Sequence, residues 1–369
     1  MKRGKRYQEA EKLIDRKKSY AVKEALEQLG VTCVIADPVL FRSKRAQKFV
    51  SSFYNGMIKN VPSTFGILYK AGVLYDSTGI ISPVYLANAS YAQCLYQYIT
   101  ENGFDAVIST HLYGMEALTA IKRKAVFDIP FYGVLTDYTL IPFLAETKLD
   151  GYFVPHKSIE EKLKSRGIPS SSIYTSGIPV SGRFNHHMPR RLARKKLGID
   201  QNKKMILVMS GGIGGANLVK LCDELIENTD IRYRIFAMTG RNESLKNEID
   251  KRYKNSEHIQ AVPFTKDINL YMNSADVLLT KPGGLSSTEA AVANVPMIHV
   301  NAIPGCETKN AVFFENHGMS YNAKNTSEAV RYALELTANA GASERMIYNQ
   351  KQNINPNAAS DIAKKVAGI

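Results

Sequence analysis

Short apolar runs alternate with amphipathic segments along this chain, a pattern typical of α/β units built on parallel sheets. In the first half, the runs expected to form strands are VTCVIAD (residues 31–37), DAVIST (105–110) and FYGVLTD (131–137). The pattern restarts with MILVMS (205–210), YRIFAMTG (233–240), DVLLTK (276–281) and VPMIHV (295–300). Helical patterns follow these runs, so the restart predicts a second α/β domain.

The boundary between the two domains is expected where both periodicities stop. GIPVSGRFNHHMPRR (177–191) is rich in Gly, Pro and polar residues and has neither a helical nor a strand period. We therefore predict a first domain over residues 1–182, a basic linker over 183–199, a second domain over 200–340 and C-terminal helices over 341–369. A C-terminal helix could return to the first domain.

Length and composition exclude several classes of protein. A chain of 369 residues suggests two domains, and it contains no apolar stretch near the ~20 residues that a membrane span needs. The N-terminal stretch MKRGKRYQEAEKLIDRKK is too charged for a secretory signal, which favours a cytoplasmic protein. The four cysteines are scattered without a CxxC pair, which argues against a zinc site and a disulfide framework.

Positive charge is concentrated in two basic islands. The chain has 48 Lys and Arg against 34 Asp and Glu, and residues 1–60 alone hold 14 against 6. RFNHHMPRRLARKK (183–196) adds six Lys and Arg and two His without an acid. Such islands attract polyanions, although each could be only a solvated surface. Since no nucleic-acid recognition motif is found, we expect an anionic membrane surface as the partner, and no nucleic acid.

Three glycine-bearing loops follow strands of the second domain: GGIGGAN (211–217), TGRNE (239–243) and KPGG (281–284). The last leads into the predicted helix LSSTEAAVA, whose Ser286 and Ser287 suit a first turn. Bare backbone N–H groups at a helix start can hold a phosphate. Glu289 could accept two ribose hydroxyls, or could simply be an acid favoured by the helix dipole.

The segment LTKPGGLSSTEAAVANVPMIHVNAIPGCETKNAVFFENHG (279–318) closely resembles the donor site of the monogalactosyldiacylglycerol synthase and processive diacylglycerol glucosyltransferase family, of glycosyltransferase family 28 type. FDAVISTH, FYGVLTDYT, GYFVPHKSIEEKLKSRGI, TSGIPVSGRF, ILVMSGGIGG, MTGRNE and VPFT fit the family in order. The resemblance implies a GT-B fold, with two Rossmann-like domains facing a cleft. The first domain would bind the acceptor and the second a UDP-sugar.

The resemblance also implies roles for individual residues of the second domain. Gly283 and Gly284 would contact phosphates beside Lys281 and Ser286, and the diphosphate would be lined by Gly211, Gly212, Gly214 and Gly215. Arg241 would contact the nucleotide, Phe264 the uracil and Glu289 the ribose. Glu307 and Asn310 would contact the sugar hydroxyls. We expect no metal and no other cofactor, because the chain has no Asp-x-Asp sequence. Helix ends, glycine amides and a basic side chain would then stabilise the leaving diphosphate.

The start of the chain departs from the family pattern. Members open with a strand and a Gly-Gly-Gly-His loop whose histidine is the expected general base, whereas this chain reads LIDRKKSY (13–20) before the first helical pattern. We therefore expect the first strand of the N-terminal domain and its loop to be missing. Asp137 and His111 remain as candidate catalytic residues at strand ends, although Asp137 could cap a turn and His111 could be a buried, backbone-bonded histidine.

The sequence thus predicts an inverting glycosyltransferase that moves a hexose from a UDP-sugar to a lipid hydroxyl, with diacylglycerol as the favoured lipid. It would lie peripherally on the inner face of the cell membrane, docked through residues 44–75 and the linker island. Three alternatives stay open: a catalytically impaired UDP-sugar sensor or scaffold, an N-acetylglucosaminyltransferase acting on a lipid-linked cell-wall precursor, and a UDP-sugar epimerase on the same fold.

Overall fold

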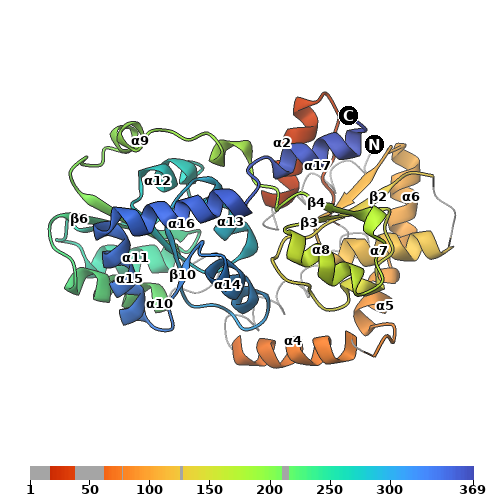
Figure 1. The fold of residues 1–369 in the computed structure, drawn as a ribbon, viewed down its shortest axis with the longest axis horizontal. Helices are drawn as coiled ribbons and strands as arrows, with labels where there is room; N and C mark the ends of the chain where they lie inside the picture. Colours follow the sequence, from red (N-terminus) through yellow and green to blue (C-terminus); the bar gives the residue numbers. More distant parts are fainter. Residues whose placement is uncertain (1–16, 38–61, 77, 125–127, 210–215) are drawn as a thin grey trace. The chain divides into compact units, whose positions relative to one another are not determined.

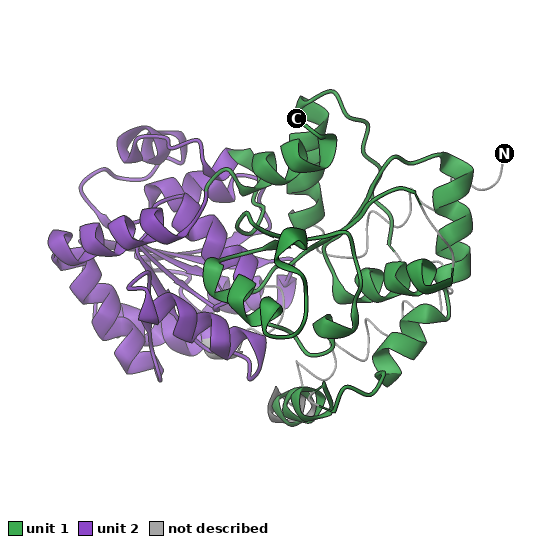
Figure 2. Cartoon of the chain, turned by 45° about the vertical axis from the view of Figure 1, so that its right-hand side comes forward, with its two compact units in different colours: residues 1–182, 356–369 green, residues 183–355 purple. Residues whose placement is uncertain are grey.

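The computed structural model describes residues 17–37, 62–76, 78–124, 128–209 and 216–369 (Figure 1). The chain divides into two compact units (Figure 2). Unit 1 comprises Met1–Gly182 together with Pro356–Ile369, and unit 2 comprises Arg183–Asn355. The chain therefore enters unit 2 where the predicted linker begins, and its last segment returns to unit 1.

The sheet of unit 1 is parallel and has the strand order β1-β2-β3-β4. Its strands are β1 (Val107–Ser109), β2 (Phe131–Val134), β3 (Gly151–Val154) and β4 (Ile173–Thr175). Because consecutive strands are neighbours, the loops that follow β1 and β2 leave the same edge of the sheet side by side. This edge carries the candidate residues His111 and Asp137.

Helices cover both faces of this sheet because successive strand residues point in opposite directions. Phe131 and Tyr152 bury against one group of helices: α5 (Pro83–Ala89), α6 (Ala92–Asn102), α7 (Leu112–Lys124) and α8 (Lys157–Lys164). Val134 and Phe153 bury on the other side, against α2 (Lys17–Gln28) and α17 (Ala358–Ala367). The C-terminal helix therefore completes the core of unit 1 (Figure 1).

Helix α4 (Pro62–Asp76) contacts the segment of unit 1 that follows β2. The hydroxyl of Tyr69 donates to the carbonyl of Leu140 at 3.3 Å, and the ring of Tyr75 lies edge-on to Phe143, with the ring centroids 6.2 Å apart. Leu140 and Phe143 belong to the segment that follows Asp137. Short 3-10 helices at Leu144–Glu146 and Ser170–Ser172 complete the described elements of this unit, and a third, at Gly182–Phe184, lies where the chain passes into unit 2.

The prediction that VTCVIAD forms a strand is wrong, because residues 31–37 form no strand. This segment is extended after α2, and the ammonium group of Lys23 donates to the carbonyl of Cys33 at 2.8 Å. A strand needs a hydrogen-bonded neighbour, and none of the described strands pairs with this segment. The apolar residues of this segment are partly buried, but apolar residues alone do not provide the neighbouring strand that a β-strand needs.

The sheet of unit 2 is also parallel, with the order β10-β9-β8-β5-β6-β7. Its strands are β5 (Lys204–Met209), β6 (Tyr233–Gly240), β7 (Ile259–Pro263), β8 (Val277–Thr280), β9 (Met297–His299) and β10 (Tyr321–Asn322). Within the unit this is the Rossmann order 3-2-1-4-5-6, in which the chain reverses its direction of travel between the first and fourth strands. Here those strands are β5 and β8, which are direct neighbours.

Helices pack on both faces of the second sheet as well. They are α9 (Arg190–Lys196), α10 (Ala216–Glu227), α11 (Glu243–Arg252), α12 (Ile268–Ser274), α13 (Gly284–Val292), α14 (Cys306–Asn316), α15 (Thr326–Ala338) and α16 (Ala340–Asn353). A hydrophobic core lies between the sheet and α10, α11, α15 and α16. Among the helices in the described parts of both units, none is long and apolar enough to cross a membrane.

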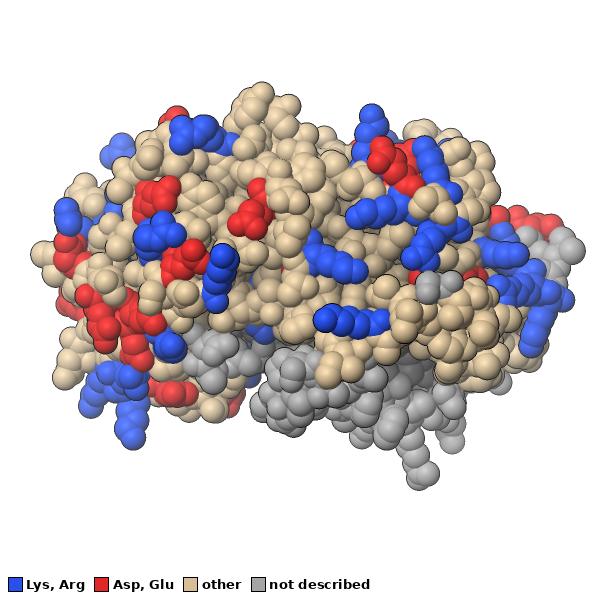
Figure 3. Space-filling model, turned by 60° about the horizontal axis from the view of Figure 1, so that its bottom comes forward, with Lys and Arg blue, Asp and Glu red and all other residues tan. Residues whose placement is uncertain are grey.

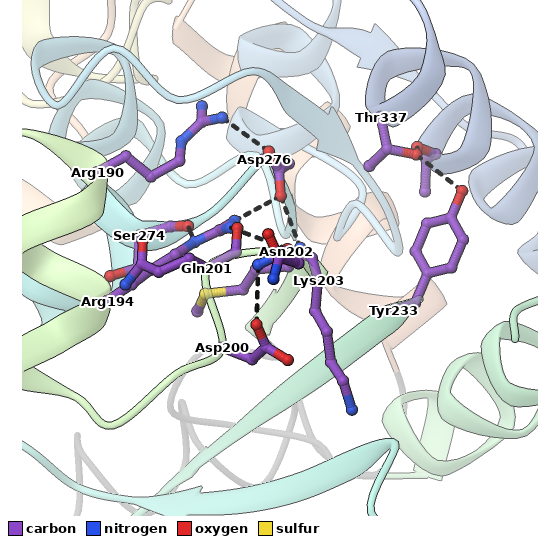
Figure 4. A network of polar contacts seen from close by, with 12 residues as sticks. Arg190, Arg194, Asp200, Gln201, Asn202, Lys203, Tyr233, Ser274, Asp276 and Thr337 are labelled. Carbon is purple, nitrogen blue, oxygen red and sulfur yellow. Dashed lines mark hydrogen bonds and ion pairs between the residues drawn. The ribbon is translucent and has the colours of Figure 1, made fainter. Parts of the chain in front are cut away.

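Part of the predicted linker is built into unit 2 through a buried ion pair (Figure 4). Arg194 on α9 is 4% exposed, and its guanidinium donates to the carboxylate of Asp276 at 2.7 Å and to the carbonyls of Ser274 and Lys203 at 3.0 and 2.8 Å. Arg190 donates to the other carboxylate oxygen of Asp276 at 2.7 Å. These two arginines therefore anchor α9 to the start of β8 and are not a loose cationic surface.

Candidate functional site

The loops at the carboxyl edge of the second sheet carry the donor-site residues predicted from the sequence. Arg241 follows β6, Phe264 follows β7, and the turn containing Lys281 and Gly283 follows β8. Since β5 and β8 are neighbours at the point where the chain reverses, the loops after them flank the crevice in which open α/β sheets bind ligands. Gly211, Gly212, Gly214 and Gly215, in the loop after β5, lie outside the described residues.

The turn after β8 leaves the amino end of α13 open. The N–H of Gly283 donates to the carbonyl of Lys281 at 2.8 Å, and no side chain of the described residues caps the helix that begins at Gly284. A Cβ atom placed on Gly283 would meet nothing within 4 Å. Backbone N–H groups of the first helical turn, including that of Ser286, are therefore available to an anion, and the helix dipole favours one there.

Asn310 and Glu307, on α14, brace the loops around this turn. Asn310 is fully buried, and its amide nitrogen donates to the carbonyl of Pro282 at 3.1 Å. A carboxylate oxygen of Glu307 accepts a hydrogen bond from the N–H of Ile303 at 2.8 Å. The structure thus brings the PGCETKN segment against the KPGG turn, and contact of either side chain with a sugar stays a prediction.

Glu289 lies on α13, and its side chain is 2% exposed. Burial of a carboxylate is costly unless other groups compensate its charge, so this residue is more constrained than an ordinary surface acid near a helix start. Its contact with ribose hydroxyls stays a prediction.

Arg241 and Phe264 form a small exposed platform at the same edge. The guanidinium carbon of Arg241 lies 4.9 Å from the centroid of the Phe264 ring, which is a cation–π contact. The N–H of Phe264 donates to the carbonyl of Gly240 at 2.8 Å, and the Phe264 side chain is 54% exposed. An exposed aromatic ring backed by a cation is suited to contact a flat base, as the sequence predicts for uracil.

His299 is a polar residue of this region that the sequence analysis missed. It ends β9, is fully buried, and its ring nitrogens lie 2.9 Å from the hydroxyl of Ser287 and 3.1 Å from that of Ser320. Burial lowers the pKa of His299 to about 3, so the ring is neutral at physiological pH. Ser287 therefore fixes α13 to the sheet rather than capping the helix, and the single His in the apolar run VPMIHV was the available signal.

In unit 1, His111 immediately precedes α7, the helix that follows β1. Its Nδ1 accepts a hydrogen bond from the N–H of Tyr113 at 3.3 Å, so in the neutral ring Nε2 carries the proton. Part of His111 reaches the surface, but the protein packed around its ring lowers the pKa of His111 to about 4. The positive charge of Lys18 is the second, smaller cause of this shift. The neutral ring is thus arranged as a helix cap, and a role in catalysis stays a prediction.

Asp137 is half-buried. It lies two residues after Leu135, whose N–H donates to the carbonyl of Phe153 on β3. Lys18 and Ser19, which were not among the predicted site residues, reach the same edge from α2. Lys18 donates to the carbonyl of Thr136 at 3.4 Å, and the hydroxyls of Ser19 and Thr110 are 2.9 Å apart. Nothing in the local sequence of a charged segment could have shown these contacts, because they join residues about a hundred positions apart.

Two Rossmann-like units, the second with an open helix end at its switch point, define the GT-B class of fold. Comparison with solved structures agrees. The structure matches MurG of Acinetobacter baumannii with a TM-score of 0.57 and 17% identity, over 76% of this chain and 78% of that one. It matches a UDP-GlcNAc 2-epimerase from Neisseria meningitidis, bound to UDP-GlcNAc, with a TM-score of 0.56 and 16% identity, over 79% and 84%. At these identities the likeness shows the fold alone.

Sequence comparison defines the family more closely. Residues 15–180 match the monogalactosyldiacylglycerol (MGDG) synthase family model, and residues 205–366 match the glycosyltransferase family 28 C-terminal domain. A processive diacylglycerol β-glucosyltransferase of Bacillus subtilis (strain 168) is 29% identical over 70% of this chain and 67% of its own length. The chain therefore belongs to the family of MGDG synthases and processive diacylglycerol glucosyltransferases. Its matches span between 57% and 67% of the length of the curated relatives.

Proposed function

We propose that this chain transfers a hexose from a UDP-sugar to the hydroxyl of a lipid acceptor, with diacylglycerol as the acceptor and inversion at the anomeric carbon. The observation that carries the proposal is the open amino end of α13 at the switch point between β5 and β8, in a chain that belongs to this family. Such an end can hold a diphosphate, and the relatives that the chain resembles carry names of diacylglycerol glucosyltransferases.

In the donor site, the leaving UDP carries the developing negative charge. The first-turn amides of α13, the Lys281 ammonium group and the glycine loop at residues 211–215 would stabilise that charge without a metal. Glu289 would accept the ribose hydroxyls, Phe264 and Arg241 would bind the uracil, and Glu307 and Asn310 would orient the sugar. No cofactor beyond the UDP-sugar is needed for this reaction.

In the acceptor site, the hydroxyl oxygen of the lipid attacks the anomeric carbon as the bond from that carbon to the diphosphate oxygen breaks. UDP leaves with the bonding electrons, and the hydroxyl proton passes to a general base. The carboxylate of Asp137 is our candidate for this base. His111 is less suited, because its Nδ1 already accepts a backbone N–H and its other nitrogen carries the proton.

The outer side of α4 supports docking to a membrane surface. Ile67 is 67% exposed, and Leu74, two turns further along the same face, is 73% exposed. Lys70 is exposed between them. The opposite side of the helix packs near the segment that follows Asp137. Lysine and arginine side chains lie close together on the right-hand part of the view in Figure 3, which belongs to unit 1. An exposed apolar helix face that carries a lysine is suited to the interface of an anionic bilayer.

This arrangement supports peripheral association with the inner face of the cell membrane, and it revises the expected contact surface. Residues 44–61 of the predicted docking segment lie outside the described residues, whereas 62–75 lie on α4. In the linker island, Arg194 is buried against Asp276, so it cannot reach lipid. The docking surface therefore centres on α4.

Vesicle co-sedimentation tests this docking. The double variant Ile67→Glu/Leu74→Glu should lose most of its binding to vesicles that contain anionic lipid, while Ile231→Glu, a matched change at a 71% exposed isoleucine of unit 2, should bind as the wild type does. Added salt should weaken wild-type binding to anionic vesicles. Equal sedimentation of the wild type and the α4 variant would contradict the assignment.

A single assay separates the proposed reaction from its alternatives. Purified protein is mixed with labelled UDP-glucose, UDP-galactose or UDP-N-acetylglucosamine, and each mixture is assayed without lipid, with diacylglycerol vesicles, and with vesicles that contain a lipid-linked cell-wall precursor. Release of UDP that depends on diacylglycerol supports the proposal. Interconversion of sugars without lipid would indicate an epimerase, tight binding without turnover a sensor or scaffold, and transfer only to a lipid-linked cell-wall precursor an N-acetylglucosaminyltransferase.

A further inference from the structure

The turn between β8 and α13 is fastened at both of its ends to one point of the sheet. Thr280 ends β8 and pairs in register with His299, the last residue of β9, and the carbonyl of Thr280 accepts the N–H of Val300 at 2.9 Å. On α13, the hydroxyl of Ser287 lies 2.9 Å from Nε2 of His299. Residues 281–286, which contain the open N–H groups at the start of α13, therefore form a loop that begins and ends beside His299.

The imidazole ring of His299 is held in one orientation. It is fully buried, and its Nδ1 lies 3.1 Å from the hydroxyl of Ser320, between α14 and β10. A neutral imidazole has one donor and one acceptor nitrogen, and a hydroxyl can act as either, so both serine bonds form together in either tautomer. Because the ring is out of reach of water, rotation of the ring would leave both nitrogens without partners.

The same ring supports α14, which braces the middle of the turn. Phe314 on α14 is fully buried and lies edge-on to His299, with the ring centroids 5.3 Å apart. One turn earlier on this helix, the amide nitrogen of Asn310 donates to the carbonyl of Pro282 at 3.1 Å. His299 therefore contacts the turn directly through Ser287 and supports it indirectly through α14.

The first turns of α13 depend on directed bonds more than on apolar packing. The buried apolar side chains of this helix lie in its second half: Ala290, Ala291 and Val292. In the first half, the hydroxyl of Thr288 donates within the helix, to the carbonyl of Gly284 at 2.6 Å, whereas the hydroxyl of Ser287 bonds to the sheet. Apolar contact is non-directional, but a hydrogen bond constrains both distance and angle, so the bond of Ser287 to His299 fixes how this end of the helix is aimed.

We propose that His299 is a positioning residue of the donor site: through Ser287 it fixes the first turn of α13 so that the backbone N–H groups there point at the diphosphate of UDP. The inference rests on the proposed function and assigns to it a residue that does not touch the donor. The ring is fully buried and both nitrogens are bonded to serines, so it acts through α13. Donors held in place before the anion arrives bind it without a cost of reorganisation.

Two serine variants of the full chain test this role by calorimetric titration with UDP and with uridine, which lacks the diphosphate. Ser287→Ala removes the bond between His299 and α13, and Ser320→Ala is the matched control that removes the other bond of the same ring. In Ser287→Ala the Kd for UDP should rise about 10-fold, the contribution of one hydrogen bond, while the Kd for uridine should change little. Ser320→Ala should bind both ligands as the wild type does.

A second matched pair changes the histidine itself. The side-chain amide of His299→Gln can reach the position of Nε2, and the shorter one of His299→Asn only that of Nδ1, while both lose the ring packed on Phe314. His299→Gln should therefore restore most of the UDP affinity, and His299→Asn should bind UDP as weakly as Ser287→Ala does. This difference separates positioning from a purely structural role, which would affect both variants alike.

The outcomes are distinguishable. Equal UDP affinities of Ser287→Ala and Ser320→Ala would overturn the role of His299, and so would parallel losses of UDP and uridine binding in Ser287→Ala. A wild-type chain that binds UDP no more tightly than uridine would refute the donor site at α13 and with it the proposed function, and the role of His299 would fall as a consequence.

Discussion

Glu116 is a buried carboxyl group whose replacement gives a direct test of the structure of unit 1. It lies on α7 with no exposed surface, and one carboxyl oxygen accepts a hydrogen bond from the amide nitrogen of Asn88 at 2.6 Å. The amide oxygen of Asn88 in turn accepts from the hydroxyl of Tyr91 at 2.8 Å. The other oxygen of Glu116 has no hydrogen-bond partner among the described residues. We expect Glu116→Gln to remove a penalty that grows as the pH rises.

The magnitude follows from the shifted ionisation of this group. Burial raises the pKa of Glu116 from 4.5 to about 8; the Asn88 hydrogen bond opposes this shift, and the charge of Glu146 adds to it. A carboxyl with a raised folded-state pKa contributes stability that is fully present below about pH 4.5 and is lost as the pH rises through about 8. A slope of about 1.4 kcal/mol per pH unit over this interval gives at most about 5 kcal/mol.

Urea unfolding of the wild type and of Glu116→Gln over this pH interval measures the difference. The free energy of unfolding of unit 1 should decline with pH in the wild type more steeply than in Glu116→Gln, which has no ionisable group at this position. Glu161→Gln, at an exposed acid on α8 of the same unit, is the matched control and should keep the wild-type slope. Parallel stability curves for the wild type and Glu116→Gln would refute the reasoning, because Glu116 would then ionise equally in the folded and unfolded chains.

Two further predictions concern unit 2. Glu289→Ala should weaken UDP binding, measured by calorimetric titration, by about 1 to 3 kcal/mol without loss of the melting transition. Glu315→Ala, at an exposed acid of α14, should bind UDP as the wild type does. Equal affinities for all three proteins would leave Glu289 only a structural role. Arg194→Met should destabilise unit 2 by about 3 to 5 kcal/mol in thermal or urea unfolding, because it removes the buried cation beside Asp276 and leaves the half-exposed Arg190 as the remaining ion-pair partner. Arg191→Met, at an exposed position on the same helix, should change little, and equal effects of the two substitutions would contradict the importance of the buried pair.

Most of the strands and the donor-site turn could be predicted from the sequence because their causes are local. The apolar run MILVMS covers all of β5 except its first residue, and VPMIHV contains β9, since strands of a parallel sheet are buried on both faces. Pro282 and Gly283 end β8 and allow the turn that opens α13. The family resemblance then supplied the roles expected for that turn, which the fold places at the switch point of the sheet.

The residues that support the site could not be predicted in this way. Asn310 was expected at a sugar, and the structure shows its amide on the carbonyl of Pro282, 28 positions earlier in the chain. His299 looked like part of an apolar strand, but its two nitrogens connect Ser287 to Ser320. A hydrogen bond is decided by which groups meet in space, and sequence spacing does not give that information for residues on different elements.

The sequence by itself determined that this protein would form two parallel α/β units, because the burial of apolar residues with a fixed period depends on their order along the chain. It also determined the positive charge of both basic islands. Only the tertiary structure decided which of those charges remain at the surface: Arg194 is buried because Asp276, 82 positions away, lies beside α9. In the same way VTCVIAD, apolar enough for a strand, forms none among the described residues, because a strand exists only where another strand completes its hydrogen bonds.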